Sequence, residues 1–240
     1  MDENIEDNFK SIVSKIKSTC ERINRDPNEI SLLAVSKKQS ADKIKNYISL
    51  TKSLGLKPAL GENYVQEYKL KREHLADDHE CHLIGHLQSN KAKLAVELFT
   101  YIETIDSEKL VASLEKELEK QGKQLPCLVQ VNVSDDINKE GIEISAVEDF
   151  ILNNFDINSR LLFSGLMTIT KFYDEPEDAR ADFRAMSDLK KLCLKNSKIC
   201  EVLSSRKFEL SMGMSADFCI AIEEGATIIR VGSSIFGSRN

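Results

Sequence analysis

One residue that could do chemistry is a lysine at the end of an apolar run. Lys37 follows residues 31–36, SLLAVS, a pattern typical of a buried strand. Desolvation lowers the pKa of an ammonium group, and the neutral amine can attack an aldehyde to form an imine. Alternation along the strand places Lys37 on the same face as Leu33 and Val35. It leaves open which of the two faces looks inward.

Two glycine loops near the C-terminus could bind an anion. Gly213 precedes Ser215 at the expected start of a helix, and Gly232 is followed by Ser233 and Ser234 after the next apolar run. Glycine lets a backbone approach a ligand, and main-chain amides at a helix start attract phosphate. A turn glycine and a plain helix cap would explain either loop alone. Together, and with Lys37, the loops indicate a ligand that carries both an aldehyde and a phosphate.

A pair of histidines raises the question of a metal. His82 and His86 are separated by three residues on a strand that runs into a glycine turn, so they need not share a face. No carboxylate or thiol in the sequence completes a ligand set beside them. The sequence therefore predicts structural histidines and no metal site.

Eight short apolar or β-branched runs are the elements expected to position these residues. They cover residues 31–36, 57–60, 80–84, 100–104, 127–133, 161–166, 208–210 and 227–231. Helical patterns lie between them, most clearly at 107–121 and at 216–224, the second with Ser215 as N-cap and Gly225 as its stop. Strands alternating with helices predict an α/β fold, a (β/α)8 TIM barrel. A doubly wound open sheet is the alternative, and both folds bind ligands at the carboxyl ends of their strands.

The chain is expected to form one domain over residues 1–240. No proline-rich or glycine/serine-rich linker divides it. An extra amphipathic helix is predicted near residues 5–24, so residues 1–28 form an N-terminal helix and lead-in. This helix would cap the bottom of the barrel or pack beside it.

Composition excludes several classes of partner. The chain has 33 basic and 39 acidic residues, a net charge of -6, which gives no general attraction to nucleic acid or to anionic membranes. Its six cysteines form no CxxC pair and indicate reduced thiols. The N-terminus lacks a signal-peptide pattern, and no apolar run approaches membrane-spanning length. We therefore expect a cytoplasmic protein with no nucleic-acid or membrane partner.

Seven segments resemble the pyridoxal phosphate homeostasis protein family. They are LLAVSK at 32–37, GENYVQE at 61–67, HLIGHLQSNK at 82–91, VQVNVS followed by KEG at 139–141, SGLMTI at 164–169, ELSMGMSADF at 209–218 and RVGSSIFGSR at 230–239. They occur in order and span almost the whole domain. The resemblance implies a barrel like the N-terminal domain of alanine racemase.

The resemblance also implies a cofactor, pyridoxal 5′-phosphate (PLP), held as an internal aldimine on Lys37. Asn63 would lie near the cofactor ring, and Arg230 would meet the pyridine nitrogen. Residues expected around the phosphate are Met214, Ser215, Gly232 and Ser233 or Ser234. Met167, which follows the sixth predicted strand, is also assigned to the cofactor site.

The function that the resemblance implies is PLP binding in intracellular vitamin B6 homeostasis, without established catalytic activity. PLP-dependent apoenzymes are the possible recipients. An arginine at the pyridine nitrogen does not surrender its proton, which makes the cofactor a weak electron sink. Racemases of this fold add a β-rich domain and a tyrosine from a dimer partner. The chain ends at Asn240 without such a domain, and we expect a monomer.

Three alternatives stay open at this point. The protein could be a PLP-dependent enzyme of the racemase type, an aldolase-like barrel that uses an imine on Lys37, or a binding protein for another phosphorylated metabolite. Tyr64 and Tyr173 are conceivable acids or bases for the enzyme alternatives. Each is also explained as a partly buried, hydrogen-bonded aromatic residue.

Overall fold

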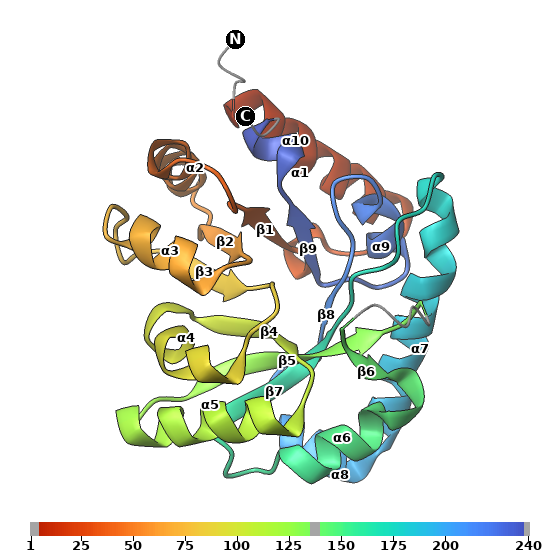
Figure 1. Cartoon of the computed structure of the whole chain (residues 1–240). Coiled ribbons are helices and arrows are strands. Elements are labelled where there is room, and N and C mark those ends of the chain that lie inside the picture. The colour runs from red at the N-terminus through yellow and green to blue at the C-terminus, as the bar shows by residue number, and fades with distance from the viewer. Residues whose placement is uncertain (1–4, 135–139, 238–240) are drawn as a thin grey trace.

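The computed structural model describes residues 5–134 and 140–237, and within them parallel strands close into a barrel (Figure 1). The barrel strands are β1 (Ser31–Val35), β2 (Ala59–Glu62), β3 (Glu80–Leu83), β4 (Tyr101–Ile105), β5 (Leu125–Asn132), β7 (Leu161–Met167), β8 (Glu209–Ser211) and β9 (Ile228–Val231). Their order is β4-β3-β2-β1-β9-β8-β7-β5, and pairing of β4 with β5 closes the ring. All eight predicted strands and the closed barrel are thus confirmed over the open sheet. A two-residue strand that was not predicted, β6 (Ile142–Glu143), pairs with β5.

Helices surround this barrel on the outside (Figure 1). They are α1 (Ile5–Arg22), α2 (Ala41–Ser53), α3 (Val65–Arg72), α4 (Ala92–Leu98), α5 (Glu108–Gln121), α6 (Val147–Asn154), α7 (Arg180–Lys195), α8 (Ser197–Leu203), α9 (Phe218–Glu223) and α10 (Ser233–Phe236). The predicted helix at 107–121 is confirmed as α5, which ends at Gly122 in the left-handed conformation (φ 62°).

The predicted start of the helix at 216 is wrong, and so is Ser215 as its N-cap. Helix α9 begins at Phe218, and residues 215–217 form a turn. The physical reason is a local hydrogen bond: the Met214 N–H donates to Asp217 Oδ1 at 2.6 Å, so the Asp217 side chain closes the turn before the helix can begin. The stop is confirmed, because Gly225 follows α9 with a φ of 102°.

The predicted N-terminal helix is α1, and it packs beside the barrel (Figure 1). It lies against α2, α9 and the C-terminal helix α10. Asn8 Nδ2 donates to the Ile235 carbonyl at 3.1 Å, and the ring of Phe9 meets that of Tyr47 edge-on at 5.8 Å. The Tyr47 ring in turn meets Phe236 of α10 at 5.7 Å. Helix α1 therefore supports the element that follows β9.

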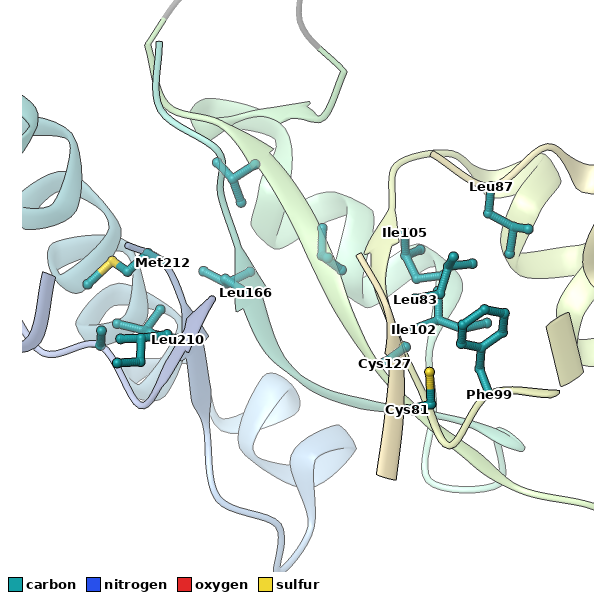
Figure 2. Close-up of a cluster of buried hydrophobic side chains, with 14 of the residues drawn as sticks. Cys81, Leu83, Leu87, Phe99, Ile102, Ile105, Cys127, Leu166, Leu210 and Met212 are labelled. Atoms are coloured by element: carbon teal, nitrogen blue, oxygen red, sulfur yellow. The ribbon is translucent and has the colours of Figure 1, made fainter. Parts of the chain in front are cut away.

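The core has two layers, one outside the strands and one inside the barrel. The outer layer joins strands to helices, and Figure 2 shows part of it around Leu83, Ile102 and Cys127. The inner cluster consists of Leu33, Ala59, Ile84, Leu128, Met167 and Ile228. Since Leu33 belongs to the inner cluster, the face of β1 that continues to Lys37 looks inward.

Over the part of the chain that the structure describes, no helix combines the length and the apolar character needed to cross a membrane.

Candidate functional site

A cavity of about 400 Å³ opens at the carboxyl ends of the strands. Segments far apart in the sequence meet there, because parallel strands of a closed barrel end at the same face. The predicted site residues in its lining are Lys37, Asn63, Met214, Ser215, Arg230, Gly232 and Ser233. The fold therefore brings together seven of the nine residues expected to hold a cofactor.

The other two predicted residues, Ser234 and Met167, are not among the described residues that line the cavity. Met167 is fully buried in the inner cluster with Leu33 and Ile228. Ser234 is half-buried on α10, where the helical rotation turns it away from the direction of Ser233.

Lys37 stands half-buried on the cavity wall beside Val35, whereas its neighbour Lys38 is exposed. On the neighbouring strand, Asn63 follows β2, which pairs with β1. Its Oδ1 is buried without a hydrogen-bond partner among the residues described. Gly85 makes this position possible, since a Cβ there would lie 2.3 Å from the Asn63 carbonyl oxygen. A buried amide that lacks a partner and lines a cavity fits a polar ligand.

Arg230 enters the cavity from β9 and is 4% exposed. Its Nη1 donates to Ser211 Oγ at 2.6 Å, and its Nη2 donates to the Thr168 carbonyl at 2.7 Å. Burial lowers the pKa of Arg230, and the nearby carboxylates of Glu103 and Asp217 oppose that shift. A guanidinium keeps its proton in proteins, so the site contains a fixed cation.

A buried chain of polar residues continues from Arg230 through the barrel interior. The Ser211 hydroxyl donates to Glu103 Oε2 at 2.5 Å, and Glu103 Oε1 lies 2.6 Å from His82 Nδ1. The His82 ring stacks on Tyr101 with centroids 4.6 Å apart. Sequence reasoning missed Glu103 and Ser211 as partners of the site. The available signal was a carboxylate in the middle of an apolar strand, which must find a partner when it is buried.

A loop after β7 forms the opposite wall with residues 169–173. The Tyr173 hydroxyl donates to Asp182 Oδ2 at 2.9 Å, and the Ser134 hydroxyl donates to the same oxygen at 2.7 Å. Burial and this hydrogen bond raise the pKa of Tyr173 to about 12, so the phenol stays protonated at neutral pH. Tyr173 is thus the partly buried, hydrogen-bonded aromatic residue that was expected. Tyr64 is not, because it is 56% exposed.

The two loops where an anion was expected to bind differ in their surroundings. After β9, Gly232 lies close to Val35, where a Cβ would come within 3.3 Å of the Val35 carbonyl oxygen. The first amides of α10 have no intrahelical acceptor and can face a ligand. After β8, the Met214 amide is taken by Asp217, whose buried carboxylate also lines the cavity. Sequence reasoning missed this negative charge; burial raises the pKa of Asp217, and its bond to Met214 lowers it.

The two histidines have separate surroundings. His82 is buried against Glu103, whereas His86 is exposed, with its Nδ1 3.4 Å from Asp106 Oδ2 and 3.1 Å from Glu140 Oε1. The ligand atoms of this second group lie within 4.8 Å of one another. The expectation that no carboxylate stands beside the histidines is therefore wrong. Loops that follow β3, β4 and β5 meet at the barrel mouth, and their meeting cannot be seen in sequence spacing.

Comparison with known proteins places this architecture. The family model described as alanine racemase, N-terminal domain, matches residues 11–240. A pyridoxal phosphate homeostasis protein of Aquifex aeolicus is 35% identical over 230 residues, which are 95% of each chain. The protein of the same name from Escherichia coli strain K12 is 33% identical and is covered over 96% of its length.

Solved structures agree with the sequence relatives. PipY of Synechococcus elongatus, whose structure has PLP bound, matches with a TM-score of 0.78 at 28% identity, over 98% of this chain and 100% of its own. An alanine racemase of Clostridium difficile shares the fold alone, at 14% identity and a TM-score of 0.66, over 97% of this chain and 56% of its own. The chain belongs to the pyridoxal phosphate homeostasis protein family, and its barrel is that of the alanine racemase N-terminal domain.

Proposed function

We propose that the protein binds PLP and acts in the homeostasis of this cofactor. The observation that carries the proposal is that Lys37, Arg230 and the loops after β8 and β9 line one cavity. An amine, a fixed cation and glycine-backed amides match the aldehyde, the ring nitrogen and the phosphate of one ligand. The names of the relatives and the PLP in the PipY structure point the same way.

Each part of the cavity has a role in this proposal. Bound PLP would supply an aldehyde for covalent capture and a ring that accepts electrons. The Lys37 amine would hold the aldehyde, and Asn63, whose Oδ1 lacks a partner within residues 5–134 and 140–237, would face the ring. The first amides of α10, at Ser233 and Ser234, would hold the phosphate. The neighbouring Asp217 carboxylate limits how much negative charge this end accepts.

We propose a non-catalytic role, and two residues support it. Arg230 is fixed by Ser211 and Thr168 and keeps its proton, so it cannot protonate the ring nitrogen, and stabilisation of a carbanion stays weak. The Tyr173 hydroxyl is committed to Asp182 and has a pKa raised to about 12, which makes it a poor general base at neutral pH.

We also propose that the protein works in the cytoplasm as a monomer and supplies PLP-dependent apoenzymes. All six cysteines are free thiols, four of them buried, which suits a reducing compartment.

Covalent capture at Lys37 tests the binding proposal. Purified protein mixed with PLP and reduced with borohydride should carry the pyridoxyl mass on Lys37 when its peptides are sequenced by mass spectrometry. Lys37→Ala should abolish this adduct, because Lys37 lines the cavity, whereas the amine of Lys171, the other lysine in its lining, lies over the Tyr173 ring. Lys38→Ala is the matched control, since Lys38 is adjacent but exposed, and its adduct yield should equal that of the wild type. Wild-type protein that gains no adduct would refute the proposal. If that protein still holds PLP, without an imine, the result would favour the alternative of a binding protein for other phosphorylated metabolites.

Turnover of D- and L-amino acids tests the non-catalytic role. We expect no racemisation and no retro-aldol cleavage by the PLP-loaded protein above the rate of free PLP. Racemisation that disappears in Lys37→Ala would establish the racemase alternative instead.

A further inference from the structure

We propose that helix α3 clamps the backbone on both sides of Lys37, and that Glu62, Glu67 and Lys71 are positioning residues for its amine. This inference deepens the proposed function and rests on it for the identity of the captured ligand. The clamp itself is a property of the chain and can be measured without any ligand.

On the N-terminal side of Lys37, the carbonyl of Ser36 is held by a lysine of α3. Lys71 Nζ donates to the Ser36 carbonyl oxygen at 2.7 Å and to Glu62 Oε1 at 2.7 Å. The Ser36 hydroxyl donates to the same Glu62 oxygen at 2.7 Å. The Glu62 side chain is fully buried, and the Lys71 side chain is 10% exposed. The residue before Lys37 is thus fixed through both its carbonyl and its side chain.

On the C-terminal side, the amide of Lys38 is held by a carboxylate of the same helix. The Lys38 N–H donates to Glu67 Oε1, which lies 2.6 Å from Lys71 Nζ. Glu67 and Lys71 are one helical turn apart on α3, so one ion pair holds both ends of the turn around Lys37. Lys38 has a φ of 59°, a left-handed conformation that is unfavourable for a side chain other than glycine. The hydrogen bond to Glu67 stabilises that turn.

The buried charges of the clamp add little to stability, which argues for a role in positioning. Glu62 Oε2 is buried and has no hydrogen-bond partner among the described residues. Burial raises the pKa of Glu62, while the contacts with Lys71 and Ser36 lower it. A buried ion pair is often no more stable than apolar residues of the same size, and one lone oxygen adds a further cost. The ion pair instead fixes the orientation of Lys37, because its charged groups hold the Ser36 carbonyl and the Lys38 amide through strong hydrogen bonds.

The segment that carries the clamp also carries part of the cavity wall. Glu62 ends β2, Asn63 follows it, and α3 begins at Val65. A shift of this segment would therefore move Asn63 and the support of Lys37 together. Asn63 and the Lys37 amine therefore keep a fixed position relative to each other.

The rate of covalent capture in Glu67→Gln and Lys71→Met tests the clamp. At equal PLP concentration, we expect the borohydride-trapped adduct on Lys37 to form about tenfold more slowly in either variant, the factor expected from loss of one charged hydrogen bond. The pH midpoint of the visible absorbance band of the PLP adduct should also shift. Lys71→Arg should restore part of the rate. Lys69→Met is the control, because Lys69 is exposed on the same helix, and it should change neither readout.

Hydrogen exchange separates the clamp from the proposed function. In the ligand-free protein, Glu67→Gln should speed exchange of the Lys38 amide by about tenfold, measured by NMR, even if PLP is not the ligand, because the neutral glutamine oxygen is a weaker acceptor than the carboxylate and no longer forms an ion pair with Lys71. Wild-type protein without an adduct would therefore refute the proposed function and leave this measurement to decide the clamp. The clamp would be overturned if Glu67→Gln left the capture rate, the pH midpoint of the absorbance band and the exchange of the Lys38 amide unchanged. This holds even if the thermal unfolding midpoint of the variant falls, because such a fall alone would show only a structural role. If Lys71→Met does not fold, Glu67→Gln decides alone, since its partly exposed side chain keeps its size.

Discussion

Buried charges at the cavity are compensated in pairs, and this decides what the individual residues can do. Arg230 reaches the buried Glu103 carboxylate through one hydroxyl, that of Ser211. Removing one member of such a set leaves an unpaired charge in the interior, which costs more than the pair gains. The guanidinium is therefore held in place by its surroundings, and a carboxylate could not replace it without a new cation nearby. Asp217 is less well compensated, because its hydrogen bond is to the neutral Met214 amide.

Asp217→Asn should make the protein more stable at neutral pH while leaving it unchanged in acid. Burial raises the folded-state pKa of Asp217 above its ordinary value of 3.8, so the folded state binds the proton more tightly than the unfolded state. The stability that this gives is complete below pH 3.8 and is lost as the pH rises through the folded pKa. Asparagine keeps an oxygen for the Met214 amide and carries no charge. Urea unfolding from pH 3.5 to 7 checks this.

The control for this variant is Asp217→Ala, which removes the acceptor for the Met214 N–H as well as the charge. It should therefore destabilise the protein in acid, where Asp217→Asn has no effect. A stability gain of Asp217→Asn that does not grow with pH would contradict the linkage argument.

At the scale of elements, close approach of backbones shapes the barrel between the neighbouring strands β7 and β8. Gly165 in β7 has a φ of 140°, and a Cβ there would lie 2.1 Å from the Glu209 carbonyl oxygen of β8. Gly122 after α5 also has a positive φ, 62°, but open space surrounds its Cβ position. Comparison of the two glycines therefore distinguishes the cost of a positive φ, which both share, from the cost of a steric clash, which arises only at Gly165.

Gly165→Ala and Gly122→Ala should therefore differ strongly in the free energy of unfolding. We expect a loss of about 1 kcal/mol for Gly122→Ala, the cost of the left-handed conformation alone. Gly165→Ala adds a collision with backbone that cannot move without separating β7 from β8, and we expect a loss above about 4 kcal/mol. Urea denaturation followed by circular dichroism measures both. Equal losses would show that β7 and β8 adapt freely.

At the scale of the whole molecule, the first and last helices support each other beside the barrel (Figure 1). Contacts run from Phe9 of α1 through Tyr47 of α2 to Phe236 of α10. The proposed phosphate-binding amides are the first two of helix α10, so the N-terminal helix supports them from a distance. Ordering of this helix and binding of an anion are expected to be linked.

Phe9→Ala should show this linkage. Phe9 is 2% exposed, and its truncation should cost about 3 kcal/mol of stability through the cavity it leaves. Because α10 loses support, the affinity for PLP should fall more than the affinity for pyridoxal, which lacks the phosphate. Lys10→Ala is the control on the exposed face of α1 and should change stability by less than about 0.5 kcal/mol. Equal losses of affinity for PLP and pyridoxal would show that α1 does not support the phosphate-binding amides.

Local patterns in the sequence were sufficient for the strands, the barrel, helix α5 and the loops that carry the candidate site. Strand and helix periodicity depend on neighbours along the chain, so the positions of apolar residues and glycines in the sequence indicate the elements and the turns between them. The start of α9 was predicted wrongly because the Asp217 side chain accepts from the Met214 amide and holds residues 215–217 in a turn. That contact is local, but residue types alone do not show whether such a turn or the helix occupies these residues.

Tertiary structure alone decided which face of β1 looks inward, how Arg230 is compensated and what holds the backbone around Lys37. Each depends on residues that closure of the barrel brings together, such as Glu103 with Ser211 or Lys71 with Ser36. Alternation gives two faces but not their direction, since the direction is set by the strands and helices that pack on either side. The sequence by itself determined the elements and the chemical groups at their ends, and the closed sheet determined which of those groups share a cavity.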